Sequence, residues 1–443
     1  MNTKESIQFI NHASVMISDK EVCLLTDPWY WGSAFHDGWS LIHENSEREI
    51  YTLLEKVTHI WVSHEHPDHF SVPFFIKFSD YLIKNRIKIL FQDTKDKRVI
   101  SFFKSRSVDV EELSNGKVYQ LSSSFDIKCV NSGFYDSALL VNVNGTKVFN
   151  LNDCPIRDDV SLNKFKKKYG TCDVLLTQFS YAAWKGGKKN INWRRDAARE
   201  KISTLLSQAK ILSAKIVIPF ASFTRFSNTY NSYMNDSVNN PDALIKLLRK
   251  EAFSTVVFQP MEVQNIDNLK QNEESLSFWK KRYQGIDYEK LLEYKDTVKI
   301  SELQELYKEY RSRILTKNSY WMIWLVSKLG FFKKVEILTK DLDSVLSLDI
   351  LSKNLIISYE NPDLIMHSQS LKFILSNSFG YDTLTVNGCF EEGKEGSFVR
   401  SAKTLAIENL NNMGVYLKPS IVFRLDLIIF FMKLVSRVAK KLK

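Results

Sequence analysis

Cysteine is scarce in this 443-residue chain, and its placement excludes several classes of protein. The five cysteines are scattered and odd in number, and no two form a C-x-x-C pair: Cys23, Cys129, Cys154, Cys172 and Cys389. This spacing argues against a disulfide framework and against a thiolate zinc module. It also argues against an iron–sulfur centre held by two cysteines and two histidines within this chain. We therefore expect a protein of the reducing cytoplasm.

Long apolar segments are also missing. Met1–Ser6 is polar, and Ile7–Ile10 is far too short for the core of a secretory signal. The longest charge-free apolar stretch near the other end is Leu427–Met432, far below the roughly 18 residues that cross a bilayer. Residues 419–443 instead have an apolar first half and a basic second half, which fits a helix at the inner face of a membrane better than one that spans it. A terminal helix docked on its own protein, or on a second copy in a homo-oligomer, is the interpretation that we prefer to membrane contact.

Histidine is rare too, and its distribution is uneven. Of eight histidines, all except His367 lie at or before position 69. Four residues with ligand-type side chains stand within six positions, directly after an apolar segment: His64, His66, Asp68 and His69. Imidazole and carboxylate are ligands that Zn²⁺ and Fe²⁺ prefer where water must become a nucleophile near neutral pH. A polar loop that is rich in histidine by chance is the competing interpretation, and the density of the cluster argues against it.

The spacing inside the cluster has a mechanical consequence. In an extended segment His64 and His66 project to the same side, because side chains alternate with a period of two. The turn at Pro67 then directs Asp68 and His69 toward a second metal position. The pattern therefore predicts a loop at a strand end that serves one or two cations.

These residues match the H-x-H-x-D-H signature of the metallo-β-lactamase superfamily, and the resemblance covers about residues 5–265. The segment 8–17 resembles the first hairpin strand of that fold, and 146–153 resembles the strand that delivers a metal-bridging aspartate. The run 27–39 is most similar to the branch that contains the lactamase-like part of CMP-N-acetylneuraminate hydroxylase. The resemblance implies an αββα sandwich with the following ligands: His64 and His66 for a first metal, Asp68 and His69 for a second, and Asp153 as the bridge.

The chain departs from the superfamily pattern downstream of the cluster. A two-metal member usually supplies a third histidine to the first metal and a late histidine to the second, and neither is present. Asp136 stands roughly where the third histidine would be, and a turn-forming aspartate at a strand start is an equal alternative. For the second metal only weak candidates remain: Ser222, Asn228 and His12. A ligand set rich in oxygen tolerates iron or manganese as well as zinc, so we expect one firmly held metal and a second that is labile or absent.

Asp153 is the strongest ligand candidate outside the cluster. It follows the apolar segment 148–151 and precedes Cys154-Pro155, where a strand must stop. A carboxylate at that place can bridge two cations. A strand-terminal aspartate that caps a turn is the alternative. Cys154 itself is typical of a small buried apolar residue.

Much of the net charge of +10 comes from lysine-rich stretches. The densest is 184–195, where two tryptophans are interleaved with five cations after the apolar segment 174–178. From it we expect a clamp for an anionic substrate such as a phosphate, a sugar nucleotide or a lipid head group, built from Trp184, Lys185, Lys188 and Arg194. A solvated loop with solubilising lysines is the alternative. A nucleic-acid substrate is disfavoured, because the chain has no recognisable nucleic-acid-binding module and its basic residues are dispersed.

The length of the chain predicts more than one domain. Short β-branched or aromatic runs alternate with amphipathic helices up to residue 265, which predicts an α+β, αββα catalytic domain over 1–265. Beyond it we expect a helical linker region over 266–335, a small α+β domain over 336–418 and a basic amphipathic tail helix over 419–443. The segment 7–18 reads as one strand and 383–386 as another. His367 fits a structural histidine in a strand better than a ligand.

The leading hypothesis is a metallo-β-lactamase-fold metallohydrolase with one or two Zn²⁺. A metal-bound hydroxide, oriented by Asp68, would attack a phosphoester, ester or amide in an anionic substrate. The alternative is an oxygenase or oxygenase-like component that acts on a sugar nucleotide and takes electrons from a partner. It does not fit the flavin-linked di-iron branch, which has Glu where His66 stands. A third possibility is a non-catalytic relative whose site has decayed.

Overall fold

The computed structural model describes residues 5–251, 253–286 and 289–419, which form two compact units. The first unit contains the described residues up to Ser227 together with Ser232–Leu291. The second contains Asn228–Asn231 and the described residues from Leu292 onward. The expected tail helix over 419–443 lies almost entirely outside the described residues.

Two seven-stranded sheets form the centre of the first unit. The first sheet has the order β17-β1-β2-β3-β6-β7-β8 and the second β16-β14-β13-β12-β11-β10-β9. The strands of the first sheet are β1 (Ser6–Asn11), β2 (Ser14–Ser18), β3 (Cys23–Thr26), β6 (His59–Val62), β7 (Lys88–Gln92), β8 (Val110–Leu113) and β17 (Val263–Asn265). Those of the second are β9 (Val118–Gln120), β10 (Phe125–Ser132), β11 (Asp136–Val143), β12 (Thr146–Asn152), β13 (Val174–Gln178), β14 (Ile216–Phe220) and β16 (Ser254–Thr255).

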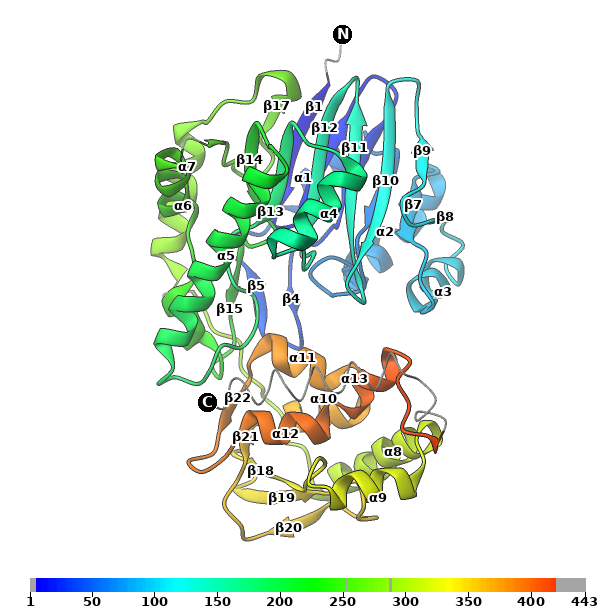
Figure 1. Ribbon diagram of the computed structural model, residues 1–443, viewed down its shortest axis with the longest axis vertical. Helices are drawn as coiled ribbons and strands as arrows, with labels where there is room; N and C mark the ends of the chain where they lie inside the picture. Colours follow the sequence, from blue (N-terminus) through cyan, green and yellow to red (C-terminus); the bar gives the residue numbers. More distant parts are fainter. Residues whose placement is uncertain (1–4, 252, 287–288, 420–443) are drawn as a thin grey trace. The chain divides into compact units, whose positions relative to one another are not determined.

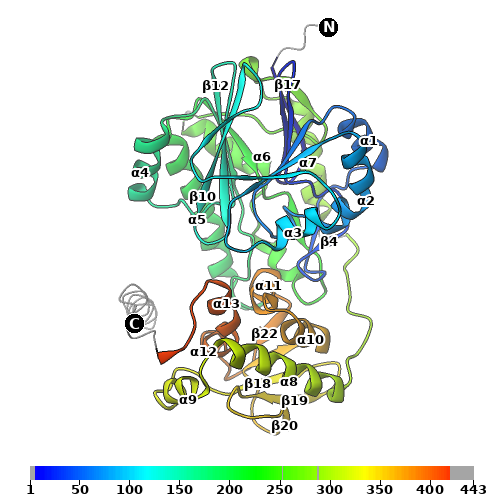
Figure 2. The same ribbon diagram turned by 90° about the vertical axis from the view of Figure 1, so that its right-hand side faces the viewer.

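Each sheet is covered on its outer face by helices (Figures 1 and 2). The helices of this unit are α1 (Glu47–Leu54), α2 (Val72–Lys84), α3 (Arg98–Lys104), α4 (Asp159–Tyr169), α5 (Ile191–Ile211), α6 (Pro241–Lys250) and α7 (Glu273–Gln284). Figure 2 shows α4 and α5 on one side of the strands and α1 and α2 on the other. A small sheet of β4 (Ser33–Ala34), β5 (Trp39–Leu41) and β15 (Thr224–Phe226) and two 3₁₀ turns, Ser232–Ser237 and Ile266–Asn268, complete the unit.

The alternation of side chains in β6 shows why the sandwich has this form. Trp61 points into the core between the two sheets, whereas Ile60 and Val62 pack with Phe74 and Phe78 of α2 on the outer side. A strand covered on both faces must be apolar throughout, and His59–Val62 is buried over its last three residues. The predicted metallo-β-lactamase αββα fold is therefore confirmed.

Two details differ from the sequence-based expectation. The segment 7–18 is a hairpin of β1 and β2 rather than one strand, and its tight turn lies at His12-Ala13, without the glycine or Asn-Gly pair that usually marks such a turn. Residues 383–386 belong to the helix α11 (Gly380–Asn387) rather than to a strand. Gly388, with φ +66, ends that helix as a left-handed cap, a role that glycine performs without strain.

The second unit has a five-stranded sheet of order β20-β19-β18-β21-β22. Its strands are β18 (Val335–Thr339), β19 (Ser344–Leu348), β20 (Ile356–Ser358), β21 (Leu364–Met366) and β22 (Phe390–Glu392). Its helices are α8 (Ile300–Lys317), α9 (Tyr320–Lys328), α10 (Ser368–Ser376), α11, α12 (Phe398–Leu405) and α13 (Ile407–Asn412). His367 caps α10 by accepting a hydrogen bond at Nδ1 from the Gln369 amide.

The region expected as a helical linker, 266–335, is divided between the two units. Trp279 of α7 is fully buried in the core of the first unit, stacked on Phe223 and edge-on to Phe9. Tyr307 and Tyr310 of α8 are buried in the second unit. No helix among the described residues is long and apolar enough to cross a membrane.

Candidate metal centre

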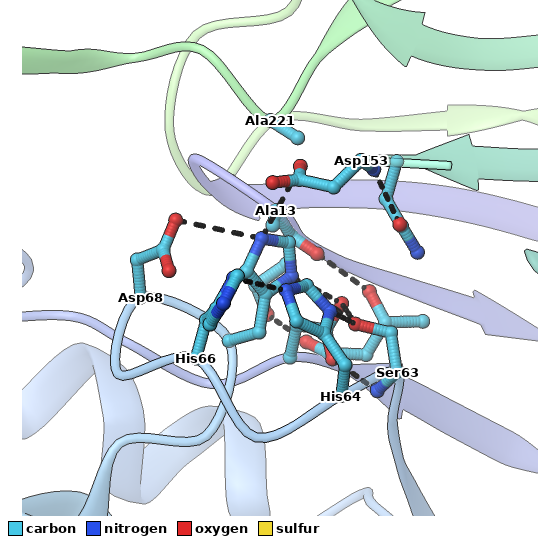
Figure 3. A network of polar contacts seen from close by, with 12 residues as sticks. Ala13, Ser63, His64, His66, Asp68, Asp153 and Ala221 are labelled. Atoms are coloured by element: carbon cyan, nitrogen blue, oxygen red, sulfur yellow. Dashed lines mark hydrogen bonds and ion pairs between the residues drawn. The ribbon is translucent and has the colours of Figure 1, made fainter. Parts of the chain in front are cut away.

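The candidate site lies where strands of both sheets end. β3 runs parallel to β6, and β12 runs parallel to β13 and β14, so in each sheet these strands finish at one edge. Asp27 follows β3, the segment 63–69 follows β6, and Asp153 follows β12. Facing sheets bring the two edges together, and residues far apart in sequence meet there (Figure 3).

Four residues other than glycine around this edge have a positive φ: His12 (37°), Asp27 (35°), Asn152 (31°) and Ala221 (46°). L-residues rarely adopt that region, and it persists only where the surroundings enforce it. The Ala221 amide donates to the His12 carbonyl at 2.9 Å, which ties the hairpin turn to the end of β14. Strain of this kind clusters at functional sites.

Asp27 orients the imidazole of His69. Its buried carboxylate accepts hydrogen bonds from the Ser63 amide (2.7 Å), the Ser63 hydroxyl (2.8 Å) and Nδ1 of His69 (2.9 Å). An ionised carboxylate only accepts, so Nδ1 of His69 carries a proton, and in the neutral imidazole Nε2 carries the lone pair. Carboxylate–histidine pairs of this form are the usual support behind a metal-binding imidazole.

The same chain of bonds fixes His64. Because the Ser63 hydroxyl donates its proton to Asp27, its oxygen accepts from Nδ1 of His64 at 2.9 Å. The lone pair of His64 is therefore on Nε2 as well. Asp27 therefore orients two imidazoles, His69 directly and His64 through Ser63, so that the Nε2 atoms of both can accept a ligand in the same part of the site.

His69 Nε2 and Asp68 Oδ1 are fully buried and have no hydrogen-bond partner in the part of the chain that the structure describes. Nε2 lies 3.5 Å from Asp68 Oδ2 and 3.4 Å from Asp153 Oδ1, and Asp68 Oδ2 lies 3.3 Å from His12 Nε2. Two ligand atoms bound at about 2.0–2.1 Å to one cation lie roughly 2.9–3.4 Å apart. Unsatisfied buried polar atoms are rare in proteins, so this donor set fits a cation.

His64, His66 and Asp136 form the neighbouring group. His64 Nε2 lies 2.9 Å from His66 Nδ1 and 3.7 Å from Asp136 Oδ1. The first separation suits either a hydrogen bond or two ligands of one cation. Ligand atoms of His64, His69 and Asp153 also lie within 4.8 Å of one another, so Asp153 is within reach of both groups.

The electrostatics match a site that needs positive charge. Burial works against the charged form of His69, but Asp68, Asp153 and Asp27 together raise its pKa well above the usual value. Burial, His69 and His66 hold the pKa of His64 well below it. Burial and the charge of Asp153 raise the pKa of Asp136 to about 7. A divalent cation would supply the charge that these carboxylates otherwise draw from a protonated His69.

Of the three weak ligand candidates, the structure brings only His12 into the cluster. Its position in the hairpin turn places Nε2 on Asp68. The Ser222 hydroxyl instead accepts hydrogen bonds from the Phe179 and Ser180 amides. Asn228 falls in the second unit.

The four residues expected to form a basic clamp lie in different surroundings in the structure. Arg194 is buried, and its guanidinium is used within the protein: it binds both carboxylate oxygens of Asp236 (2.9 and 2.6 Å) and the carbonyls of Gly187 (2.6 Å) and Lys188 (3.1 Å). Arg194 therefore holds the loop 186–188 and does not face a substrate, which corrects the expectation for this residue. Trp184 is buried edge-on against Trp193, and Lys188 is exposed.

Lys185 lies elsewhere, in a pocket of about 150 Å³ that opens beside Asp153. The pocket is lined mainly by residues from the ends of β12 and β13 and from α5, among them Arg157, Gln178, Glu200 and Lys201. Sequence reasoning missed Arg157 and Lys201. Arg157 follows Asp153 by four positions and could have been predicted, because residues after the carboxyl ends of parallel strands gather at one edge of a sheet. Lys201 is one of several basic residues in an amphipathic helix, and nothing in the sequence distinguishes it.

No family model matches the chain. Among curated proteins it is similar to cytidine monophosphate-N-acetylneuraminic acid hydroxylase from Danio rerio, at 24% identity over 275 residues, which cover 58% of this chain and 45% of the relative. The inactive form of that hydroxylase from Homo sapiens is 24% identical over 267 residues, 56% of this chain and 51% of the relative. The chain spans about half the length of the curated relatives that it matches.

Solved structures with a similar arrangement include CmlA, a diiron β-hydroxylase from Streptomyces venezuelae, at 12% identity and a TM-score of 0.42 over 60% of this chain and 55% of that one. The metallo-β-lactamase fold protein YhfI from Bacillus subtilis has 14% identity and a TM-score of 0.39 over 59% of this chain and 99% of its own. At these scores the fold assignment rests on the facing sheets, their strand order and the histidine loop.

Proposed function

We propose that this protein is a metal-dependent hydrolase of an anionic substrate. The observation that carries the proposal is the buried Nε2 of His69, which has no hydrogen-bond partner among the described residues and faces Asp68 and Asp153, while Asp27 holds the ring proton on Nδ1. Such an arrangement has little use in a binding module without a cation, because each unsatisfied buried polar group costs about 1–3 kcal/mol.

A bound divalent cation would act as a Lewis acid and lower the pKa of a coordinated water toward about 7. His69, Asp68 and His12 would hold a cation in one position, and His64 and His66 would hold one in the neighbouring position. Asp153 would be a ligand in either position. Asp68 Oδ1, which has no partner among the residues that the structure describes, can accept a proton or a hydrogen bond from water in the site. Gln178 donates to Asp153 at 2.5 Å and fixes the direction of that carboxylate.

The test begins with metal content. The purified full-length protein should contain close to one equivalent of zinc, iron or manganese, with a second that is lost on dialysis. The double replacement His64→Ala and His66→Ala should remove most of it. His59→Ala is the matched control, since His59 lies at the opposite end of the same strand, β6, and bonds only to Thr58 among the described contacts. Metal content unchanged by the double replacement contradicts the proposal.

Hydrolysis is tested on the metal-loaded protein with a panel of chromogenic phosphoesters, carboxylic esters and amides. Turnover by the wild type that vanishes in the double variant and survives in His59→Ala supports a hydrolase. Loaded protein that turns over none of these classes would favour the second candidate.

That second candidate is an oxygenase component acting on a sugar nucleotide, and the similarity to the sialic-acid hydroxylases favours it. It requires electrons from a partner protein, since the five cysteines offer no iron–sulfur motif. Iron as the bound metal and oxygen uptake on addition of a reductant would support it. Zinc as the bound metal, with no oxygen uptake, would exclude it.

A further inference from the structure

The pocket beside Asp153 has an unusual concentration of positive charge. Arg157, Lys185 and Lys201 line it, and among the described residues the carboxylates of its wall are Glu200 and Asp153. These five come from three separate segments of the first unit: the end of β12, the loop after β13, and α5. If Asp153 serves the metal centre, the remaining wall carries three cations against one carboxylate.

Lys201 and Arg157 both have N–H donors available to a ligand. Lys201 is half-buried and donates from Nζ to Gln178 Oε1, and the Gln178 amide donates in turn to Asp153 Oδ1 at 2.5 Å. This chain holds Lys201 at the end of the pocket next to the metal centre and leaves two of its three ammonium protons for other acceptors. Arg157 is exposed and, among the residues that the structure describes, makes no hydrogen bond or ion pair.

The half-buried ammonium of Lys201 is costly without an anion. Burial and the charges of Arg157 and Lys185 together lower its pKa to about 8, although Asp153 opposes the shift. Three mutually repelling cations around one small cavity are stabilised by an anion placed among them.

Size and donor geometry select the anion. A cavity of about 150 Å³ is large enough for a group the size of benzene, which suits one phosphoryl group but not a whole nucleotide. Arg157 offers a planar fork and the two lysines offer point charges, so together they can meet three non-bridging oxygens. A carboxylate has only two oxygens and a single charge.

We propose that Arg157, Lys185 and Lys201 bind a phosphoryl group of the substrate in this pocket, next to Asp153. The inference rests on the proposed hydrolase function and narrows it: the substrate is a phosphoester, and its phosphorus lies beside the metal centre.

The experiment measures inorganic phosphate binding to the metal-loaded full-length protein by titration calorimetry at pH 7.5. Arg157→Gln and Lys201→Gln should each weaken binding about tenfold or more, because each removes a charge-assisted hydrogen bond. Lys210→Gln is the control, because Lys210 is an exposed lysine further along the same helix. It should change phosphate affinity by less than about twofold. Lys201→Arg, which keeps the charge, should recover most of the affinity lost in Lys201→Gln. Acetate at the same concentration should not compete.

The outcome separates this inference from the proposed function. Equal phosphate affinity in the wild type, Arg157→Gln and Lys201→Gln would overturn the phosphoryl site, even where metal binding and hydrolysis of another ester class persist. Competition by acetate as strong as by phosphate would also overturn it. If the proposed function is wrong but the phosphoryl site is right, the separate metal measurement finds no bound metal, while Arg157→Gln still lowers phosphate affinity. Lys201→Gln with reduced metal content but unchanged phosphate affinity would give Lys201 a purely structural role and contradict the inference.

Discussion

Replacing Asp27 by asparagine should remove the metal site while leaving the shape of the protein almost intact. The asparagine oxygen can still accept from the Ser63 amide, as Asp27 does at 2.7 Å. Its amide nitrogen then faces His69 Nδ1, where Asp27 now accepts at 2.9 Å. An amide donor there requires an unprotonated Nδ1, so the proton of His69 moves to Nε2, which can no longer bind a cation.

The size of the effect follows from the contacts. Loss of the orienting partner of a metal-bound histidine costs about 10–100-fold in metal affinity, and a wrong tautomer at His69 should place Asp27→Asn at the upper end. Asp27→Ala leaves three buried donors without an acceptor, each worth about 1–3 kcal/mol. Because neighbouring contacts are not additive, we expect a total loss of stability of about 3 kcal/mol for that variant.

The assay is competition for metal against a chelator of known affinity, with nitrogen-15 spectra of the histidine rings as the second readout. Asp19→Asn is the matched control, since Asp19 is also buried, accepts from the Val22 amide and from Ser122 and Ser124, and lies at the opposite end of β2 from His12. Metal affinity in Asp27→Asn equal to that of the wild type and of Asp19→Asn would refute the reasoning, as would an unchanged Nδ1–H tautomer at His69.

Three further predictions follow from single contacts. Arg194→Ala leaves the carbonyls of Gly187 and Lys188 without their donor, so it should lower the free energy of unfolding by about 2–3 kcal/mol in urea titrations without changing the metal content per folded molecule; a loss below about 1 kcal/mol contradicts the structural role. Phosphate affinity should be present below the lowered Lys201 pKa of about 8 and fall as pH rises through it, because the ammonium loses its charge there, and calorimetry from about pH 7.5 to 9.5 should show this fall in the wild type but only at higher pH in Lys201→Arg. Trp279→Ala should cost about 3–5 kcal/mol through the cavity it leaves in the first unit, and a near-neutral result in the same urea assay would contradict the placement of α7.

The sequence predicted the parts of the site that depend on local pattern. The histidine loop follows an apolar strand, and Asp153 ends another, so strand polarity alone indicated that these side chains gather at sheet edges. The αββα layers followed from the alternation of apolar runs and amphipathic helices, and from the resemblance that the H-x-H-x-D-H motif carries.

The parts that local pattern could not predict depend on tertiary contacts. His12 reaches Asp68 only because β1 and β2 form a hairpin whose turn carries no turn-forming residue, so a continuous strand was the natural expectation. The role of Asp27 depends on the parallel pairing of β3 with β6, which brings Ser63 and His69 to it. Whether Arg194 faces solvent or Asp236 is decided by a loop 42 residues away in sequence, and a charge run cannot show that.

The central claim is that His69 Nε2, with the ring proton held on Nδ1 by Asp27, binds a cation together with Asp68 and Asp153. The most direct measurement is a crystal structure of the metal-loaded protein with anomalous scattering at the edge of the bound metal. We predict an anomalous peak about 2.0–2.2 Å from His69 Nε2 and within bonding distance of an oxygen of Asp68 or Asp153. A metal-loaded crystal with its anomalous peak elsewhere, and with His69 Nε2 hydrogen-bonded to protein, would contradict the account.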